Sequence, residues 1–266
     1  RQVYRGLDIG SGKDLDDYIV DGKPVPYHLI DIVDLDHEFN VFEYQRSFFD
    51  VFADLSARDA LPFVVGGTGL YVESVLRGYR MVEVPENPDL RARLSGKTME
   101  ELCAILGELR EQVHNTTDLH DRERLVRAIE IASCSRTSKP EPTPEVRALI
   151  LGTRWPRPIL RKRIYRRLKE RLEHGLIEEV EQLVASGVSW EKLHFLGLEY
   201  RFVADYLQGT IRNRNDLLQK LASAIAQFAK RQDTWFRRME RNGTLIQWID
   251  KADYDTAEDL VRERLS

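Results

Sequence analysis

The sequence predicts an α/β fold that carries an all-helical insertion, and two observations support this. Leu61-Pro62-Phe63-Val64-Val65 is apolar like a buried strand and continues through the tight turn Gly66-Gly67-Thr68-Gly69 into a helix. Residues 83–142 instead carry helical patterns without strand patterns. Because strand and helix alternate in a parallel sheet, we expect residues 1–82 and 143–266 to form an α/β core interrupted by the helical insertion.

Hydrophobic periodicity predicts the other elements. His28–Val33 is a β-rich apolar run, and Val41–Ala57 has apolar residues at helical spacing. Val146–Gly152 and Leu245–Ile249 return to strand patterns. A capping box at Thr98-Met99-Glu100-Glu101 opens a helix to about residue 111, and the stretch 133–144 has the composition of a linker. Further helices are expected over residues 124–131, 158–175, 177–186, 200–209 and 217–239.

Composition narrows the classes of protein to consider. The chain has 266 residues, enough for a core domain with an insertion. It contains no apolar run of roughly 18 residues and no signal-peptide pattern, so we expect a cytoplasmic protein without a membrane span. Cys103 and Cys134 are far apart in the sequence and have no Cys or His at metal-ligand spacing beside them, so the sequence suggests neither a disulfide framework nor a structural zinc site. The net charge of −4 argues against nonspecific coating of nucleic acid.

The glycine turn at residues 66–69 is the first candidate site. Backbone N–H groups at a helix N-terminus favour an anion, and Thr68 adds a hydroxyl donor. Such a turn is more often a simple connection between elements. It is not a Walker A motif, because no Lys-Ser/Thr pair follows the glycines.

Two basic segments are further candidates. Arg163 and Arg167 lie four residues apart on one helical face, where two guanidinium groups could hold a diphosphate; salt bridges to nearby acids are the alternative. Gln227–Arg237 mixes basic and aromatic residues, as RNA-binding surfaces do. Trp235 and Phe236 could equally be core residues.

Five segments in order resemble the signature blocks of bacterial tRNA dimethylallyltransferases, the IPP transferase family. They are Arg1–Gly10, His28–Ile32, Gly66–Tyr71, Arg124–Glu130 and Gln227–Arg237. Each block alone is weak, but five in order with similar spacing are specific. The resemblance implies a P-loop NTPase-like parallel-sheet core and a helical insertion that grips the anticodon arm of tRNA.

The resemblance implies a reaction as well. The family moves a dimethylallyl group from dimethylallyl diphosphate to N6 of the adenosine 3′-adjacent to the anticodon, in tRNAs that read codons beginning with U, and releases diphosphate. Mg²⁺ is the implied cofactor, and a monomer is expected. Three other hypotheses remain open: a prenyltransferase acting on free adenylate, a small-molecule kinase with the same core, and a noncatalytic RNA-binding remnant.

Residue roles follow from the resemblance. Thr68 and Arg167 are the implied catalytic residues, and Arg163 and Gly67 join Arg167 in binding diphosphate. The implied tRNA contacts are Arg1, Gln2, Arg91, Glu123, Arg124, Leu125, Val126, Arg127, Tyr200, Arg201, Lys230, Arg231 and Gln232.

Part of the implied site is expected outside the printed residues. The phosphate loop with its Mg²⁺-binding threonine, and an aspartate that serves as general base, are expected before Arg1, so no metal ligand is assigned within the chain. One position departs from the family pattern: many relatives have glycine where this chain has Glu199.

Overall fold

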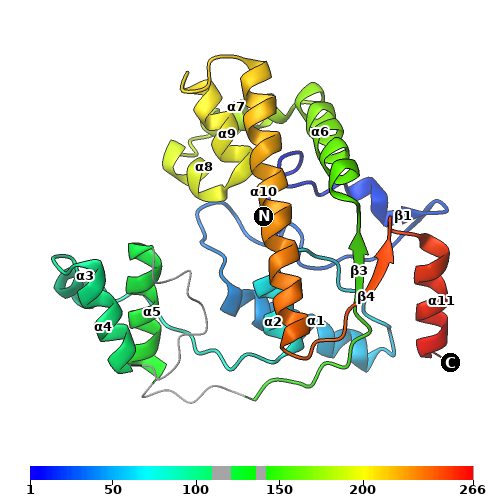
Figure 1. Cartoon of the computed structure of the whole chain (residues 1–266), viewed down its shortest axis with the longest axis horizontal. Coiled ribbons are helices and arrows are strands. Elements are labelled where there is room, and N and C mark those ends of the chain that lie inside the picture. Colours follow the sequence, from blue (N-terminus) through cyan, green and yellow to red (C-terminus); the bar gives the residue numbers. More distant parts are fainter. Residues whose placement is uncertain (110–120, 136–141, 266) are drawn as a thin grey trace. The chain divides into compact units, whose positions relative to one another are not determined.

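The computed structural model describes residues 1–109, 121–135 and 142–265 (Figure 1). The chain forms two compact units, Arg1–Arg77 with Val146–Ser266, and Gly78–Glu145. The predicted insertion, residues 83–142, falls within the second unit. The fold mixes helices with small sheets.

Helices build most of the first unit. Its longest helix, α10, begins after the N-cap Asn213, whose side chain accepts a hydrogen bond from the Asp216 N–H. Helix α10 packs against α2, α6 and α9, so it connects the beginning and the end of this unit (Figure 1). The bounds are η1 Leu15–Tyr18, α1 Val41–Ala57, α2 Gly69–Leu76, α6 Arg157–Glu173, α7 Leu176–Ala185, α8 Trp190–Leu196, α9 Leu198–Leu207, α10 Arg214–Arg241 and α11 Tyr254–Leu265.

The strands of the first unit are short. Strand β3, Leu151–Arg154, pairs in parallel with β4, Gln247–Asp250. Strands β1, Ile19–Val20, and β2, Lys23–Pro24, form an antiparallel hairpin. The predicted strand at Leu245–Ile249 is thus confirmed with a shift of its bounds, whereas only the last two residues of Val146–Gly152 belong to β3.

The prediction of a buried strand at Leu61–Val65 is wrong. This segment is outside every strand of the described chain, and Phe63 and Val65 are 73% and 90% exposed. The predicted strand at His28–Val33 is reduced to one parallel bridge between Val33 and Tyr4. An apolar run shows only that a segment is able to form a strand, because a ladder also needs the N–H and C=O groups of a neighbouring strand.

The helix predictions are largely confirmed. Helix α1 has the predicted bounds, and α6, α7, α9 and α10 begin and end within a few residues of theirs. The short helices α3, α8 and α11 were not predicted. Helix α3 begins at Pro88. Proline is tolerated at the first helical position, where its missing N–H would have no partner anyway.

The second unit is a small helical bundle. It contains α3, Pro88–Leu94, α4, Met99–Leu109, and α5, Arg122–Ser135. The predicted capping box is present: the Thr98 N–H donates to Glu101 Oε2 at 2.8 Å, and the Glu101 N–H donates to Thr98 Oγ1 at 3.3 Å. The predicted end of this helix at residue 111 and the middle of the predicted linker lie outside the described residues. The hydrophobic core of the second unit consists of Leu94, Leu102, Leu106, Leu125, Ile129 and Ala132.

The capping box gives a stability prediction. Replacing Thr98 with Ala removes the acceptor for the Glu101 N–H and should lower the free energy of unfolding of this unit by about 1 kcal/mol. Hydrogen exchange of the α4 amides should become faster by a corresponding factor. Thr98→Ser keeps the hydroxyl and serves as the control; equal effects of Ala and Ser would show that the cap does not stabilise α4.

Candidate functional site

The glycine turn places Thr68 at the start of α2. Thr68 is the N-cap residue, and its carbonyl oxygen accepts hydrogen bonds from the Tyr71 and Val72 N–H groups at 3.0 and 3.1 Å. Its side chain, in contrast, makes no capping hydrogen bond and is exposed. The hydroxyl is therefore not used by the helix that it precedes and is available to a ligand.

Helix α10 holds the glycine turn from one side. Gln232 Nε2 donates to the Gly67 carbonyl oxygen at 2.7 Å. A Cβ atom on Gly67 would overlap that nitrogen, and one on Gly69 would overlap the indole ring of Trp235. The Trp235 ring therefore leaves no room for a side chain at residue 69, whereas a side chain at residue 67 would displace the end of the Gln232 side chain. The sequence pattern alone did not reveal this close approach of α10.

A buried carboxylate connects α2 with α10. The Glu73 side chain is only 2% exposed, and its Oε2 accepts hydrogen bonds from Trp235 Nε1 at 2.9 Å and from Arg238 Nη2 at 3.0 Å. The Arg238 guanidinium also lies 3.9 Å from the centroid of the Trp235 ring. Trp235 is therefore a structural residue of the turn, the alternative that the sequence had left open.

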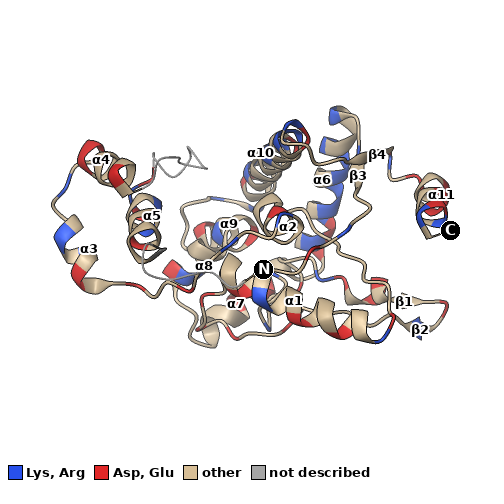
Figure 2. Cartoon of the chain, turned by 90° about the horizontal axis from the view of Figure 1, so that it is seen from below, with Lys and Arg blue, Asp and Glu red and all other residues tan. Residues whose placement is uncertain are grey.

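Two arginines of α6 meet at the second candidate site. Arg167 Nη2 and Arg171 Nη2 both bond Asp14 Oδ2, at 2.6 and 3.3 Å. Positions occupied by Lys and Arg, blue in Figure 2, are frequent along the ribbon of α6. Burial, followed by the charge of Arg167, lowers the pKa of Arg171. A pocket of about 350 Å³ is lined by Ile9, Asp14, Arg167, Glu170, Arg171 and His174.

Arg163 lies outside this pocket. Its guanidinium stacks on Trp155, 4.2 Å from the ring centroid, in a cation–π contact. The structure thus brings Arg167 together with Arg171 and not with the predicted Arg163. The i, i+4 spacing that pointed to the first pair continues to Arg171, so extending the same pattern by one helical turn would have found it.

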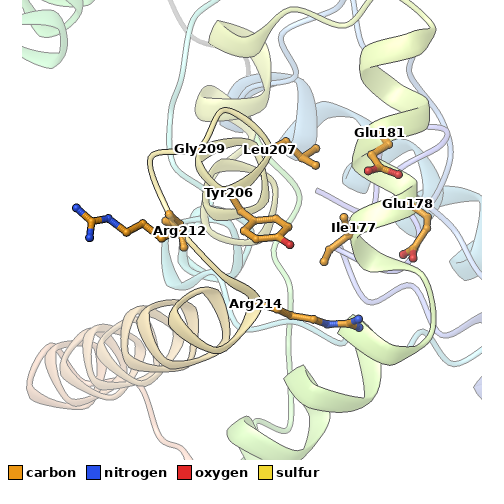
Figure 3. A pocket seen from close by; sticks show the side chains of 9 residues that line it. Ile177, Glu178, Glu181, Tyr206, Leu207, Gly209, Arg212 and Arg214 are labelled. Atoms are coloured by element: carbon orange, nitrogen blue, oxygen red, sulfur yellow. The ribbon is translucent and has the colours of Figure 1, made fainter.

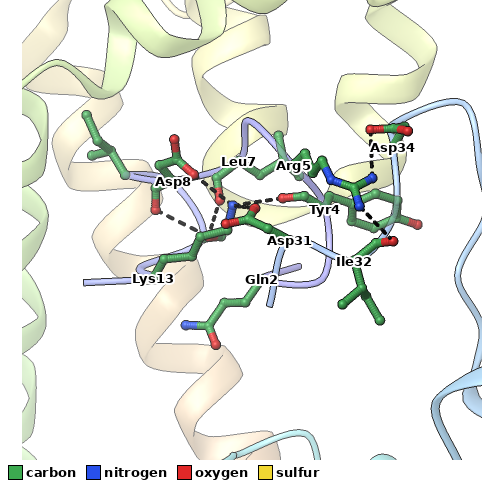
Figure 4. A network of polar contacts seen from close by, with 12 residues as sticks. Gln2, Tyr4, Arg5, Leu7, Asp8, Lys13, Asp31, Ile32 and Asp34 are labelled. Carbon is green, nitrogen blue, oxygen red and sulfur yellow. Dashed lines mark hydrogen bonds and ion pairs between the residues drawn. The ribbon is translucent and has the colours of Figure 1, made fainter. Parts of the chain in front are cut away.

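Buried Lys13 fixes the loop that leads to Asp14 (Figure 4). Lys13 is 3% exposed, and its Nζ donates to the Tyr4 carbonyl at 2.8 Å and to Asp8 Oδ1 at 2.7 Å. It also forms an ion pair with Asp31. A lysine removed from water needs such partners to stay charged, and here they tie the first residues of the chain to the segment around Asp31.

The partly buried Glu179 of α7 binds the same loop. Its carboxylate accepts hydrogen bonds from the N–H groups of Asp8, Ile9 and Gly10 at 3.2, 2.6 and 3.2 Å. Tyr200, 1% exposed, donates its hydroxyl to Glu179 at 2.8 Å, and burial and then the Glu179 charge raise the pKa of Tyr200. The Tyr200 side chain, predicted to meet tRNA, thus supports the loop from the core.

Glu199 is close enough to Arg167 and Arg171, which line the 350 Å³ pocket, for their charges to act on it. Its side chain is partly buried, and this burial raises the pKa of its carboxyl group. The positive charges of Arg171, Arg167 and Arg1 act in the opposite direction. The position that departs from the family pattern therefore adds a carboxylate close to the residues assigned to diphosphate.

In the second unit, Glu130 organises two of the predicted tRNA contacts. Its side chain is fully buried, and it accepts from Arg91 Nε at 2.8 Å and Nη2 at 3.1 Å, and from Arg127 Nη1 at 3.0 Å. The Asn87 N–H donates to the same carboxylate at 2.9 Å. Burial alone would raise the pKa of Glu130, but these donors outweigh it and lower the pKa to about 2.

The other predicted tRNA contacts differ in exposure. Leu125 is fully buried in the core of the second unit and Val126 packs partly against it, so the Leu125 side chain cannot face RNA. Gln2 is partly buried and donates to the Gly12 carbonyl at 2.8 Å. Six are exposed: Arg1, Glu123, Arg124, Arg201, Lys230 and Arg231.

A larger pocket, of about 670 Å³, lies elsewhere in the first unit (Figure 3). None of the predicted site residues lines this pocket. Its lining includes two acidic residues, Glu178 and Glu181, and two basic residues, Arg212 and Arg214. Figure 3 shows the Arg212 side chain directed away from Ile177. Because its acidic and basic residues are equal in number, this pocket has no excess of positive charge to bind a phosphate ligand.

The described residues contain no cluster of three or more His, Cys, Asp or Glu side chains that could hold a metal ion. A Mg²⁺ ion held by protein side chains alone does not fit this part of the chain.

None of the described helices has the length and apolar character needed to cross a membrane.

Residues 2–239 match the sequence profile of a family described as IPP transferase, and the chain belongs to this family. A "tRNA dimethylallyltransferase 1" of Geotalea uraniireducens (strain Rf4) is 59% identical over 250 residues, covering 94% of this chain and 81% of that protein. One of the same name from Syntrophus aciditrophicus (strain SB) is 54% identical over 268 residues, covering 100% and 88%.

Two solved structures are similar to this fold. The tRNA isopentenylpyrophosphate transferase of Bacillus halodurans superposes with a TM-score of 0.67 at 28% identity, over 99% of this chain and 84% of that one. A eukaryotic dimethylallyltransferase acting on tRNA superposes with a TM-score of 0.72 at 19% identity, over 99% and 69%. Because the eukaryotic enzyme is only 19% identical to this chain, its similarity supports the fold and no functional assignment.

The lowered pKa of Glu130 predicts a pH dependence of stability. The pKa of the folded state lies near 2 and the ordinary value is 4.5, so the carboxylate stabilises the fold fully above about pH 4.5 and loses this effect as the pH falls toward 2. Glu130→Gln should destabilise the second unit on the order of 3 kcal/mol at pH 7. The difference from the wild type should shrink in acid.

Hydrogen exchange of the α5 amides at several pH values measures this difference. Glu123→Gln is the matched control, because Glu123 lies on the same helix with an exposed side chain. A Glu130→Gln effect that stays constant between pH 7 and pH 3 would contradict the assigned ion pairs.

Proposed function

We propose that this protein is a tRNA dimethylallyltransferase, which transfers the dimethylallyl group of dimethylallyl diphosphate to N6 of the adenosine 3′-adjacent to the anticodon. The observation that carries the proposal is the convergence of Arg167 and Arg171 on one carboxylate oxygen of Asp14. Two guanidinium groups that share one anionic oxygen suit a diphosphate, whose oxygens can replace the carboxylate as partners.

In the proposed reaction, N6 of the adenine attacks C1 of the dimethylallyl group. The C1–O bond breaks, its electron pair leaves with the diphosphate, and the N6 proton passes to a general base. Arg167, which is exposed, and Arg171, which is largely buried, stabilise the negative charge that grows on the leaving diphosphate. Thr68 contributes a hydroxyl donor, because its side chain makes no capping hydrogen bond to helix α2.

A bound Mg²⁺ would supply additional positive charge at the diphosphate. This ion commonly keeps several waters and uses one or two protein oxygens together with phosphate oxygens. The core would then correspond to a P-loop NTPase-like domain, of which β3 and β4 form a part.

The tRNA would be bound by exposed cations on both units. Lys230 and Arg231 lie next to each other on α10 with exposed side chains. In the second unit, Glu130 holds Arg91 and Arg127 in one place, and each guanidinium keeps more than a third of its surface exposed. The protein would act as a cytoplasmic monomer on the anticodon stem-loop.

The direct test uses the full-length protein, an anticodon stem-loop RNA and dimethylallyl diphosphate labelled in the prenyl group. Transfer of label to the RNA, with release of diphosphate, is the expected result. Transfer to free adenosine monophosphate instead of RNA would identify an adenylate prenyltransferase, and ATP turnover without prenyl transfer would identify a kinase. RNA binding without either reaction would contradict an enzymatic role.

Arg167 and Arg127 should give opposite kinetic patterns. Arg167→Ala removes a charge-assisted contact that strengthens as the diphosphate leaves, so kcat/KM for the prenyl donor should fall about 30- to 1000-fold, equivalent to roughly 2–4 kcal/mol. Its affinity for tRNA without donor should be unchanged. Arg127→Ala should weaken tRNA binding and reduce the salt dependence of binding, while donor affinity is retained.

The melting temperature of each variant is the control. If Arg167→Ala lowered it severely and the remaining folded protein were fully active, Arg167 would be a structural partner of Asp14 and the diphosphate assignment would be wrong.

A further inference from the structure

Asp14 occupies the place in the arginine pocket where an anionic ligand is proposed to bind. Its Oδ2 atom accepts from Arg167 Nη2 at 2.6 Å and from Arg171 Nη2 at 3.3 Å, and all three residues line the pocket of about 350 Å³. Glu170 belongs to the same lining. The carboxylates of Asp14 and Glu170 therefore balance the two guanidinium groups, and the pocket gains an excess of positive charge only when Asp14 leaves it.

Packing holds Arg171 in the pocket independently of Asp14. The Arg171 side chain is 16% exposed, and Gly12 lies directly against it, since a Cβ atom on Gly12 would overlap the Arg171 Nη2 atom. Burial lowers the pKa of Arg171, and the charge of Arg167 lowers it further. An anion between two such cations reduces their repulsion. In this structure Asp14 supplies that anion, but it is not needed to place Arg171.

The Asp14 side chain can leave the pocket at low cost. It is 49% exposed, and it makes no capping hydrogen bond to η1, which follows it. Beyond η1 lies the β1–β2 hairpin, whose residues Ile19 and Val20 are exposed. On the other side, Lys13 is buried and held by ion pairs (Figure 4). The Asp14 carboxylate can therefore swing into solvent while Lys13 keeps the loop in place.

We propose that Asp14 is an internal competitor for the diphosphate that Arg167 and Arg171 bind. Diphosphate binding displaces the Asp14 carboxylate, and the carboxylate returns as the product leaves. The leaving diphosphate gains a charged oxygen when the C1–O bond breaks, so two arginines bind the product more tightly than the prenyl donor. Competition by Asp14 weakens this product complex and speeds its release. This inference rests on the proposed function, since it takes diphosphate as the ligand of the pocket.

The test compares Asp14→Asn with the wild type in the full-length protein, with inorganic pyrophosphate as the ligand in titration calorimetry. Asn has the size of Asp and tolerates the left-handed backbone of residue 14, where φ is 40°, but it carries no charge. We expect the dissociation constant of pyrophosphate to fall about 3- to 10-fold, because binding no longer breaks ion pairs of modest strength. Inhibition of prenyl transfer by added pyrophosphate should strengthen by the same factor.

Asp16→Asn is the matched control, because Asp16 lies two residues further along, in η1, with an exposed side chain. This variant removes the same charge and should leave the affinity for pyrophosphate nearly unchanged. In an Arg167→Ala background the effect of Asp14→Asn should shrink, because one of the two ion pairs that the ligand must break is already absent.

An unchanged or weaker affinity of Asp14→Asn for pyrophosphate would overturn the competition, as would the absence of pyrophosphate binding in both proteins. An equal gain from Asp16→Asn would also overturn it, because the gain would then come from net charge alone. Pyrophosphate binding does not require prenyl transfer. Tighter binding by Asp14→Asn in a protein that transfers no prenyl group would refute the proposed function alone, whereas prenyl transfer with unchanged pyrophosphate affinity would refute the competition alone.

Discussion

A carboxylate that is withdrawn from water must be surrounded by hydrogen-bond donors, and this requirement organises the molecule. Glu73, in the middle of α2, accepts hydrogen bonds from Trp235 and Arg238 of α10. Glu179 gathers three consecutive N–H groups of the first loop together with the Tyr200 hydroxyl. An unpaired charge in these places would cost several kcal/mol, so each carboxylate fixes chain segments that are distant in the sequence.

The candidate site is a consequence of these anchors. The loop fixed by Glu179 and Lys13 carries Gly12, where a side chain would overlap the Arg171 guanidinium, and then Asp14, which receives both arginines of α6. The turn fixed by α10 carries Thr68. The two arginines assigned to the donor therefore lie on helix α6 and face a loop that Glu179 and Lys13 hold in place, whereas Thr68 lies on a glycine turn that α10 holds, and both arrangements provide preorganisation.

The sequence predicted the helices well and the sheet poorly, for a physical reason. Helical hydrogen bonds are local, so the periodicity of Val41–Ala57 and the capping box at Thr98 were enough to locate α1 and the start of α4. A strand needs a partner elsewhere, and Leu61–Val65 has none among the described residues. The same limit applies to the site: Arg167 could be proposed from its spacing, whereas its partner Asp14 is 153 residues away.

The sequence by itself determined the family, because the order and spacing of five segments are linear properties of the chain, and it determined which side chains have the chemistry for diphosphate and RNA. Only the tertiary structure decided what those side chains contact. It placed Arg163 on Trp155 and Gln232 on the Gly67 carbonyl, and it buried Leu125 and Tyr200. The reason is that exposure, and the choice between a ligand and another part of the chain as hydrogen-bond partner, depend on residues that meet only after folding.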